Sequence, residues 1–360
     1  MRPQGGRVQY LCLQPTREGQ GSHAHVWGLV GGLQRRGWTV TVHQPPLETA
    51  RRGLWGRVGP MLAAQASLWR DLRRGDVLYV RMHPLAAPLL WTNVVAGLWR
   101  SRARAVVEVN GPEDDWIAAW PSLGRVRGLL RLLIRSQLRV ADGVVVVTEG
   151  LGHWVAGMAG AQVEVEVVPN GVDVTRFAAD RGAEPPGGRP YAVFVGELAP
   201  WQGVEDLVGA FAHDDWPDGV DLLVAGTGAG EGLLADCPAV DGRALRHLGA
   251  VPHADVPSLL AGASVALVTS RDRGGTGIAP LKLFEALSTG VPVVASDVPD
   301  IPRYHSGPLV RPGDVAGWAA AVAAVVSGSV ETGIAPAADH SWDDRARRTE
   351  RLLGDRKCPY

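Results

Sequence analysis

The chain contains 360 residues, more than one hydrophobic core usually organises, so its length predicts two domains. Hydrophobic residues make up 46% and charged residues 20% of the sequence, which excludes an intrinsically disordered chain. The formal net charge of −1 argues against a nucleic-acid-binding protein that depends on a global basic field.

Short β-branched runs alternate with helical segments through the first half of the chain. We expect strands at 7–14, 39–45, 76–83, 105–110, 143–148 and 165–171, and helices at 25–37, 55–75 and 124–143. Strands that alternate with helices predict a parallel sheet with helices on both faces.

A similar alternation restarts after a Gly- and Pro-rich linker at 181–190. We expect strands at 191–197, 221–227, 265–270, 291–296 and 307–312, helices at 203–212, 255–262, 280–289 and 313–327, and a last helix in 341–355. The predicted fold class is α/β, with two doubly wound, Rossmann-like domains that face a central cleft. Ligands of such sheets bind beyond the carboxyl ends of the strands.

The cysteines Cys12, Cys237 and Cys358 lie far apart, without a CxxC pair. This spacing excludes a disulfide framework and a cysteine-based zinc site, and it suits a reducing compartment. The N-terminal segment has no signal-peptide core, and no run of about 18 apolar residues could span a bilayer. We therefore expect a cytoplasmic protein.

One lysine stands out because the chain has only two, Lys282 and Lys357. Lys282 follows a glycine-rich loop and Pro280, which fits the first turn of a helix. Helix N-termini offer free N–H groups and a positive dipole end, so this turn predicts a phosphate site. Glu285, on about the same helix face, could accept from ligand hydroxyls. The alternative is an ordinary surface pair between Lys282 and Glu285.

Three other features have competing explanations. The segment "GTGAGEG" (226–232) fits a dinucleotide fingerprint but lacks the acidic residue expected further on, so we favour a tight turn. His23 and His25 alternate as in some metal sites, but no third ligand is evident, and we predict no metal. His83 ends a strand, where it could face the cleft or have a structural role.

Several segments together resemble glycosyltransferase family 4. "PLKLFEALSTGVPVVAS" (280–296) is similar to the donor-site signature of that family, and "VEVVPNGVDVTRF" (165–177) resembles its interdomain segment. "VFVGELAPWQGVEDLVGAFA" (193–212) resembles the opening of its C-terminal domain, and "GQGSHAHVWGLVGGLQRRGWTVTV" (19–42) its first loop and helix. The matching segments occur in the family's order from about residue 8 to residue 300.

The resemblance implies the GT-B architecture. The acceptor-binding domain would span residues 1–175, the sugar-nucleotide-binding domain 176–340, and a C-terminal helix in 341–360 would cross back to the first domain. The implied activity is retaining transfer of a sugar from a nucleoside-diphosphate sugar, with UDP or GDP as the nucleotide. No further cofactor is implied, and the absence of a D-x-D triplet favours a metal-independent enzyme.

Site residues follow from the resemblance position by position. Lys282 would contact the donor diphosphate, Glu285 the ribose hydroxyls, and Val251 the base. The residues implied around the diphosphate and the sugar are Gly21, Ser22, Gln202, Thr276, Gly277, Ile278 and Ala279. Asn110 occupies the place where many relatives have a histidine near the reacting centre, and His83 is the other catalytic candidate.

The chain also departs from the family pattern. Gly277 replaces the first glutamate of the EX7E motif, and Glu197 and Gln202 replace an Arg and a Lys near the start of the second domain. The phosphate would then depend more on Lys282, with Arg271 or Arg273 as substitutes. These losses leave a catalytically silent binding or partner subunit as an alternative. An epimerase or hydrolase of sugar nucleotides and an NAD-dependent oxidoreductase are further alternatives.

The arginine-rich segments 51–74 and 125–140 have apolar faces. Packing on a sheet explains them, and so would contact with an anionic membrane, as in relatives with lipid-linked acceptors. We favour packing on the sheet and a soluble small-molecule acceptor, and we expect no nucleic-acid partner.

Overall fold

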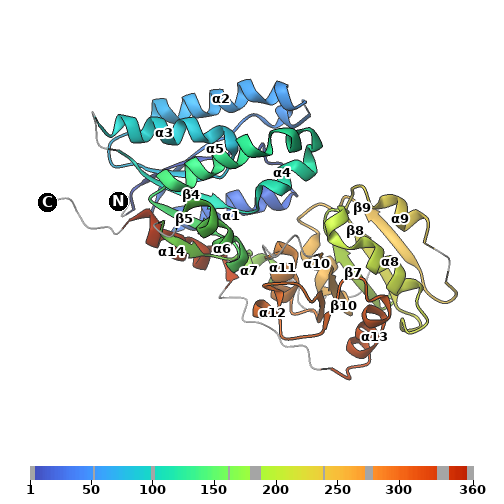
Figure 1. Ribbon diagram of the computed structural model, residues 1–360. Coiled ribbons are helices and arrows are strands. Elements are labelled where there is room, and N and C mark those ends of the chain that lie inside the picture. The colour runs from blue at the N-terminus through green and yellow to red at the C-terminus, as the bar shows by residue number, and fades with distance from the viewer. Residues whose placement is uncertain are drawn as a thin grey trace. The chain divides into compact units, whose positions relative to one another are not determined.

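The computed structural model describes residues 5–51, 53–98, 102–160, 163–178, 188–237, 240–271, 279–330 and 340–354. The chain divides into two compact units (Figure 1). Unit 1 comprises residues 1–169 and 342–360, and unit 2 comprises residues 170–341. The boundary thus follows Pro169, six residues before the predicted end of the first domain at 175, and the chain returns to unit 1 after Ser341.

Unit 1 contains a six-stranded parallel sheet in the order β2-β1-β3-β4-β5-β6 among its described residues. The strands are β1 (Arg7–Leu11), β2 (Thr39–His43), β3 (Val77–Arg81), β4 (Arg104–Val109), β5 (Gly143–Val146) and β6 (Val165–Val167). The α-helices are α1 (Gly21–Arg35), α2 (Leu54–Asp71), α3 (Ala87–Ala96), α4 (Glu113–Ala119), α5 (Arg127–Val140), α6 (Glu149–Ala159) and α14 (Trp342–Leu353). Short 3₁₀ helices are η1 (Leu47–Arg51), η2 (Pro84–Ala86) and η3 (Pro121–Val126).

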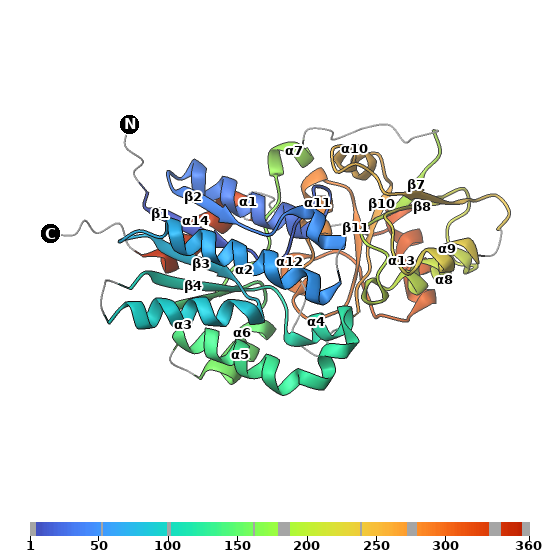
Figure 2. The same cartoon turned by 90° about the horizontal axis from the view of Figure 1, so that it is seen from above.

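Helices cover both faces of this sheet. α14 packs against α1 on one face, and α2, α3 and α5 lie over the other face (Figure 2). α5 buries Leu130, Ile134 and Leu138, whereas its arginines point outward. The stripe of these three leucine and isoleucine side chains is therefore packed on the domain, as expected for a helix that covers a sheet, whereas Leu129 and Leu132 of the same helix are exposed.

The described ranges of unit 2 form a second six-stranded parallel sheet in the order β12-β11-β10-β7-β8-β9. The strands are β7 (Tyr191–Val195), β8 (Asp221–Ala225), β9 (Leu245–Gly249), β10 (Val265–Val268), β11 (Val293–Ser296) and β12 (Leu309–Val310). The helices are α7 (Val174–Ala178), η4 (Pro200–Gln202), α8 (Val204–Ala212), α9 (Glu231–Ala235), α10 (Val256–Ala261), α11 (Leu281–Thr289), α12 (Ile301–Tyr304) and α13 (Val315–Val326).

The predicted fold class, two Rossmann-like α/β domains, is confirmed for each unit taken by itself. The strand order of unit 2 is that of a doubly wound dinucleotide-binding fold, and the order of unit 1 matches the flavodoxin-like variant. Chain order reverses between β7 and β10 in unit 2 and between β1 and β3 in unit 1. Ligands of such sheets bind at these points, beyond the carboxyl ends of the strands.

The sequence pattern missed helices α3, α4 and α6, and among the strands of the described residues it missed β9. Its sequence is LRHLG, and Arg246, His247 and Leu248 are exposed, because β9 is the edge strand of the described sheet, next to β8. An exposed edge strand has no apolar alternation to reveal it.

The glycine-rich segment 226–232 forms a tight turn between β8 and α9. Gly226 has a φ of 144° and approaches the loop after β7 so closely that an added Cβ would lie 1.8 Å from the carbonyl oxygen of Gly196. The following helix, α9, spans only five residues. A turn that brings two loops together explains these glycines without a bound dinucleotide.

Candidate functional site

Lys282 lies at the point where strand order reverses in unit 2. Its Nζ donates to the carbonyl oxygen of Thr269, which follows β10, at 2.7 Å. It also donates to Oε1 of Gln202, in η4 after β7, at 2.5 Å. The amine is 4.3 Å from the ring centroid of Phe194 on β7. The side chain of Lys282, on α11, therefore extends to the carboxyl ends of the adjacent strands β7 and β10.

The charge of Lys282 has no carboxylate partner among the described residues, since its two acceptors are neutral oxygens. The ion pair with Glu285 that helical spacing permits is not formed. Burial lowers the pKa of Lys282 to about 7. A bound anion would raise that pKa again, because it favours the charged amine. This environment suits an amine that binds a negatively charged ligand.

The start of α11 faces the same region. Pro280 is the N-cap residue, one position before the helical turn in which we expected it. Within the described part of the chain no side chain caps this terminus. The backbone N–H of Leu283 donates to the carbonyl oxygen of Pro280, and the N–H groups of Leu281 and Lys282 are the ones that an anion could use. Ala279, directly before it, is buried, and its carbonyl oxygen accepts from Nδ2 of Asn170 at 2.6 Å.

Glu285, one turn further along α11, pairs with His253. Nε2 of His253 is 3.1 Å from Oε1 of Glu285, and the ring of His253 packs against Phe177. The Glu285 side chain is 13% exposed, so a ligand can reach it. Val251, the residue predicted beside the base, is partly buried on the same loop after β9.

Of the other residues considered for the donor site in unit 2, the structure describes Gln202, Glu197 and Arg271. Gln202 contacts Lys282 directly, whereas Glu197 is exposed after β7. Arg271 contacts Asp206 at 3.2 Å and Glu205 at 3.6 Å, so acidic side chains at the start of α8 already hold it. Thr276, Gly277, Ile278 and Arg273 lie outside the described residues.

In unit 1, Gly21 and Ser22 are the first two residues of α1 rather than part of a loop. No side chain of the described residues caps this helix, and it begins shortly after β1, where chain order reverses. The first N–H groups of a helix can bind an anion, and the approach of Gly21 and Ser22 to a diphosphate stays a prediction.

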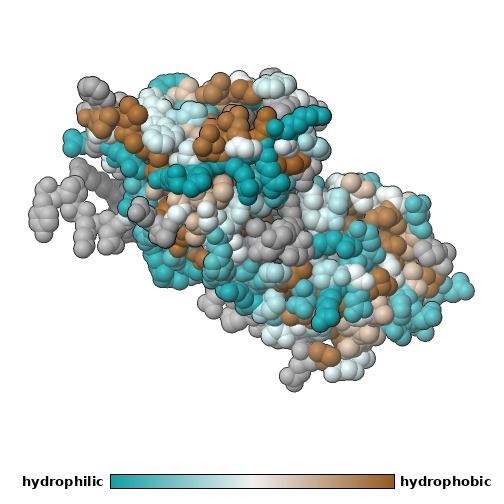
Figure 3. All heavy atoms as spheres, in the orientation of Figure 1, coloured by the Kyte–Doolittle hydropathy of each residue, from teal (hydrophilic) through white to brown (hydrophobic). Residues whose placement is uncertain are grey.

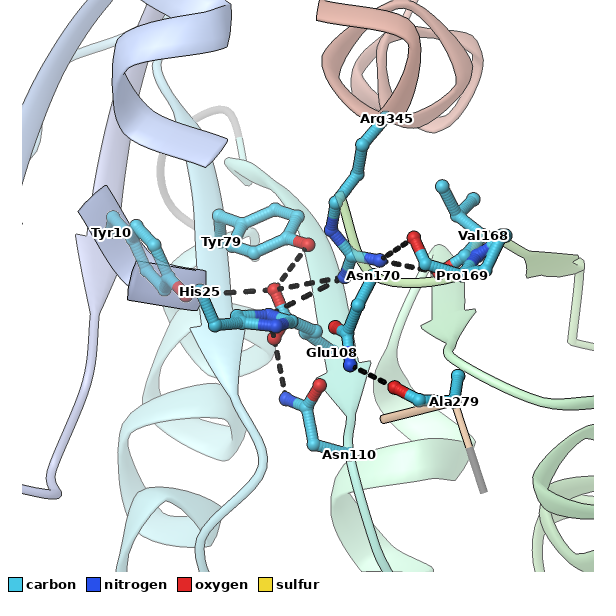
Figure 4. Close-up of polar contacts among 10 residues, drawn as sticks. All are labelled: Tyr10, His25, Tyr79, Glu108, Asn110, Val168, Pro169, Asn170, Ala279 and Arg345. Carbon is cyan, nitrogen blue, oxygen red and sulfur yellow. Dashed lines mark hydrogen bonds and ion pairs between the residues drawn. The ribbon is translucent and has the colours of Figure 1, made fainter. Parts of the chain in front are cut away.

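Asn110 follows β4, and its Nδ2 donates to Oε1 of Glu108 at 2.5 Å (Figure 4). Glu108 is fully buried within the apolar run of β4 that follows Arg104, and Oε1 also contacts Nε2 of His25. Tyr79 donates to the other oxygen at 2.7 Å, and Tyr10 lies 3.5 Å from it. Glu108 therefore accepts from the amide nitrogen of Asn110. Among the described residues no group donates to the amide oxygen of Asn110, which could accept a hydrogen bond from a ligand.

Arg345 of α14 completes the cluster around Glu108. It lies 3.9 Å from Glu108 and donates to the carbonyl oxygens of Val168 and Pro169. Burial alone would raise the pKa of Glu108, but His25, Arg345 and Arg81 hold it well below its usual value. Burial lowers the pKa of His25 despite the nearby carboxylate. The hydrogen bond from His25 and the charges of Arg345 and Arg81 therefore favour the carboxylate form of Glu108.

His83, the other catalytic candidate, caps the short helix η2. Its Nδ1 accepts from the backbone N–H of Leu85 at 3.2 Å, and its ring packs edge-on against Trp116. Burial lowers the pKa of His83 to about 4, so the ring is neutral at physiological pH. These contacts favour the structural role for His83.

No group of three potential metal ligands occurs within the described ranges. His25 contacts Glu108 and Arg345, and His23 packs beside Trp27. Nor does any helix in the described part of the chain have the length and apolar character to cross a bilayer.

Two protein-family models match most of the chain. One, described as Glycosyltransferase Family 4, matches residues 19–176, and the other, described as Glycosyl transferases group 1, matches residues 189–327. The chain belongs to the family 4, group 1 glycosyltransferases. The O-antigen chain mannosyltransferase B of Escherichia coli is 26% identical to this family member over 183 residues. The match spans 44% of this chain and 44% of that relative.

Solved glycosyltransferase structures have the same fold as this family 4 chain. A sucrose-phosphate synthase from Thermosynechococcus elongatus has a TM-score of 0.71 at 16% identity, covering 96% of this chain and 98% of that one. The Anabaena protein HepE, solved with UDP and glucose, has a TM-score of 0.61 at 15% identity, covering 96% and 99%. The predicted GT-B architecture is thereby confirmed at the level of fold.

Proposed function

We propose that the chain is a retaining glycosyltransferase that transfers a sugar from a nucleoside-diphosphate sugar, with UDP or GDP as the nucleotide, to a soluble small molecule. The donor would bind in unit 2, at the carboxyl ends of β7 and β10. The solved relative with bound UDP and glucose is consistent with this choice of donor class. We further propose a cytoplasmic enzyme that needs no metal ion.

The observation that carries the proposal is the environment of Lys282. A partly buried amine without a carboxylate partner among the described residues lies beside the uncapped start of α11 and at the sheet's switch point. Each of these features favours an anion, and together they favour a diphosphate. Glu285, one helical turn away, would accept from the ribose hydroxyls.

The reaction needs charge stabilisation more than covalent chemistry. As the bond from the sugar to the diphosphate breaks, negative charge grows on the leaving phosphate. Lys282 and the N–H groups of α11 would stabilise that charge, because they already lie near the phosphate position before the reaction. Stabilisation of a developing charge by preorganised donors is the largest contribution to catalysis in many such sites. Asn110 would orient the acceptor or the sugar through its free amide oxygen. The leaving phosphate would take the acceptor proton on the face that the acceptor attacks.

A ligand panel tests the donor site. Purified protein is heated with UDP, GDP, dTDP, ADP or NAD, beside Lys282→Ala and the control Arg189→Ala. Arg189 is exposed and precedes β7, so it lies at the amino ends of the strands, whereas Lys282 lies at their carboxyl ends. A nucleoside diphosphate at a hundred times its dissociation constant should stabilise the protein by about 2.7 kcal/mol. Lys282→Ala should lose that response and Arg189→Ala should keep it.

Each outcome of the panel separates the alternatives. No stabilisation by any nucleoside diphosphate would favour the silent binding subunit, and stabilisation by NAD alone would favour an oxidoreductase. If a diphosphate binds, turnover is measured with its sugar derivatives. Lys282→Ala should lower turnover about a hundredfold, the effect of removing one charge-stabilising donor. Products identify the reaction, since an altered free sugar without a glycosylated acceptor would indicate an epimerase or hydrolase.

A lipid-linked acceptor is a second candidate because of one surface of unit 1. Exposed large hydrophobic side chains gather over α2, α3 and α5, beside hydrophilic ones (Figure 3). They are Trp55, Leu62, Trp91, Val95, Leu98, Val126, Leu129 and Leu132, and the exposed arginines of the same region include Arg125, Arg127, Arg131, Arg135 and Arg139. Apolar side chains next to arginines suit an anionic lipid surface.

Vesicle binding decides between the two acceptor classes. The protein is centrifuged with vesicles of phosphatidylcholine alone or with phosphatidylglycerol added. A lipid-linked acceptor predicts sedimentation with the anionic vesicles only, reduced in the double variant Leu129→Ser, Leu132→Ser. A protein that stays in the supernatant with both vesicles contradicts this second candidate.

A further inference from the structure

His253 lies between β9 and α10 and contacts the carboxylate that we propose for the ribose. Its Nε2 is 3.1 Å from Oε1 of Glu285, and its ring centroid is 5.8 Å from that of Phe177 on α7. Phe177 is buried, whereas the side chains of His253 and Glu285 are 26% and 13% exposed. Three segments of unit 2, separated in the chain, therefore meet at a pair that solvent still reaches.

The contact occupies only one oxygen of Glu285. Among the described residues no other group donates to this carboxylate, so Oε2 remains for a ligand. A free glutamate on a helix surface samples several rotamers, and a hydrogen bond to one oxygen restricts them. Packing against Phe177 in turn restricts the imidazole ring. As a structural ion pair, a partly exposed contact of this kind contributes little to folding.

We infer that His253 is a positioning residue that fixes Glu285 for the hydroxyl groups of a ribose and thereby makes the donor site selective for ribonucleotides. This inference rests on the proposed function, because it concerns the same donor site. His253 would not contact the diphosphate, so its effect should appear in recognition of the sugar ring of the nucleoside. The chemical class selected is a nucleoside diphosphate with free 2′- and 3′-hydroxyls.

The test compares UDP with 2′,3′-dideoxy-UDP, and GDP with its dideoxy counterpart, by titration calorimetry. The unsubstituted protein should bind the ribonucleotide about tenfold more tightly, the usual effect of a hydrogen bond to a charged group. His253→Phe keeps an aromatic ring beside Phe177 but removes the donor. It should reduce the preference to about threefold or less and leave the affinity for the dideoxy form unchanged.

Three further variants separate positioning from a structural effect. His253→Gln retains an N–H donor and should retain the preference. In a Glu285→Ala background, His253→Phe should change nothing more, because the two residues act through one contact. His213→Phe is the matched control, because His213 is similarly exposed and also lies beside a carboxylate, that of Asp215. His213 follows the C-terminal end of α8, at the amino ends of the strands and away from Glu285.

The results distinguish this inference from the proposed function. If the unsubstituted protein binds no nucleoside diphosphate, the proposed function is wrong and the inference is wrong with it. If it prefers the ribonucleotide and His253→Phe keeps the full preference, only the role of His253 is wrong. Equal losses of affinity for the ribo and dideoxy forms would also overturn it, because they would indicate a general distortion of the site.

Discussion

Lys282 shows how strongly surroundings can change one side chain. Its amine lies against the ring of Phe194, and its acceptors are an amide oxygen of Gln202 and a backbone carbonyl. Burial lowers its pKa to about 7, which means that the ligand-free protein gives up part of the stability that a solvated ammonium would provide. Shifted pKa values of this kind, with their cost in stability, are common among residues of functional sites.

This lysine should make the stability of the ligand-free protein depend on pH. Between about 7 and about 10.5 the unfolded chain holds a proton that the folded chain has released, so stability rises with pH in that window. The penalty is complete below about 7 and absent above about 10.5. Lys282→Met should remove this slope. Urea denaturation across pH 6 to 10 measures the free energy of unfolding of the unsubstituted protein and of Lys282→Met. The same pH dependence in both proteins would contradict this prediction.

At the scale of elements, the contact between α1 and α14 depends on two glycines of α1. A Cβ at Gly28 would lie 2.2 Å from the indole of Trp342, and a Cβ at Gly32 would lie 2.6 Å from the backbone oxygen of the same residue. The helices therefore approach each other more closely than any residue with a side chain would allow at these positions. Sequence periodicity alone shows an apolar face on α1 but not which helix covers it.

Gly32→Ala should weaken this contact. Alanine favours a helix over glycine by about 1 kcal/mol, yet the added methyl group meets backbone that cannot move aside. Overpacking of this kind typically costs about 1–3 kcal/mol, so we expect net destabilisation. Gly31→Ala is the control, because its Cβ would meet only the flexible end of Arg35 at 3.3 Å. Urea denaturation of both variants measures the difference, and equal stabilities would show that the helices adjust freely.

At the scale of the whole molecule, the chain leaves unit 1 after Pro169 and returns to it after Ser341. Arg345 lies just after the return and binds the carbonyl oxygens of Val168 and Pro169, just before the departure. The same guanidinium lies beside Glu108. Glu108 and Arg345, which lie 237 positions apart in the sequence, thus belong to one buried cluster, and we expect unit 1 to need its last helix for stability.

Arg345→Met tests that requirement. Removing one partner of a buried ion pair leaves an uncompensated charge and typically costs about 3–5 kcal/mol. Arg351→Met is the control, since Arg351 is exposed on the same helix and pairs with Glu166 at the surface. An exposed pair contributes about 1 kcal/mol or less. Urea denaturation compares the two variants, and an Arg345→Met protein as stable as Arg351→Met would show that His25 and Tyr79 suffice for Glu108.

Some features followed from the sequence by itself because they depend on neighbouring residues. Alternating strands and helices predicted two α/β domains, and the rarity of lysine drew attention to Lys282 and the helix that carries it. A charge inside "AVVEVN" could have identified Glu108 as well, since a buried strand rarely contains an unpaired carboxylate. Local propensity and periodicity are sufficient for inferences of this kind.

Other features were decided only by the tertiary structure. Edge strand β9 has no apolar pattern, so its pairing with β8 is what defines it. The partner of Glu285 is His253 rather than Lys282, although helical spacing favours the lysine. Arg345 reaches a glutamate that lies far earlier in the sequence. These contacts join residues that are distant along the chain, and local sequence preferences carry no information about which distant segments fold together.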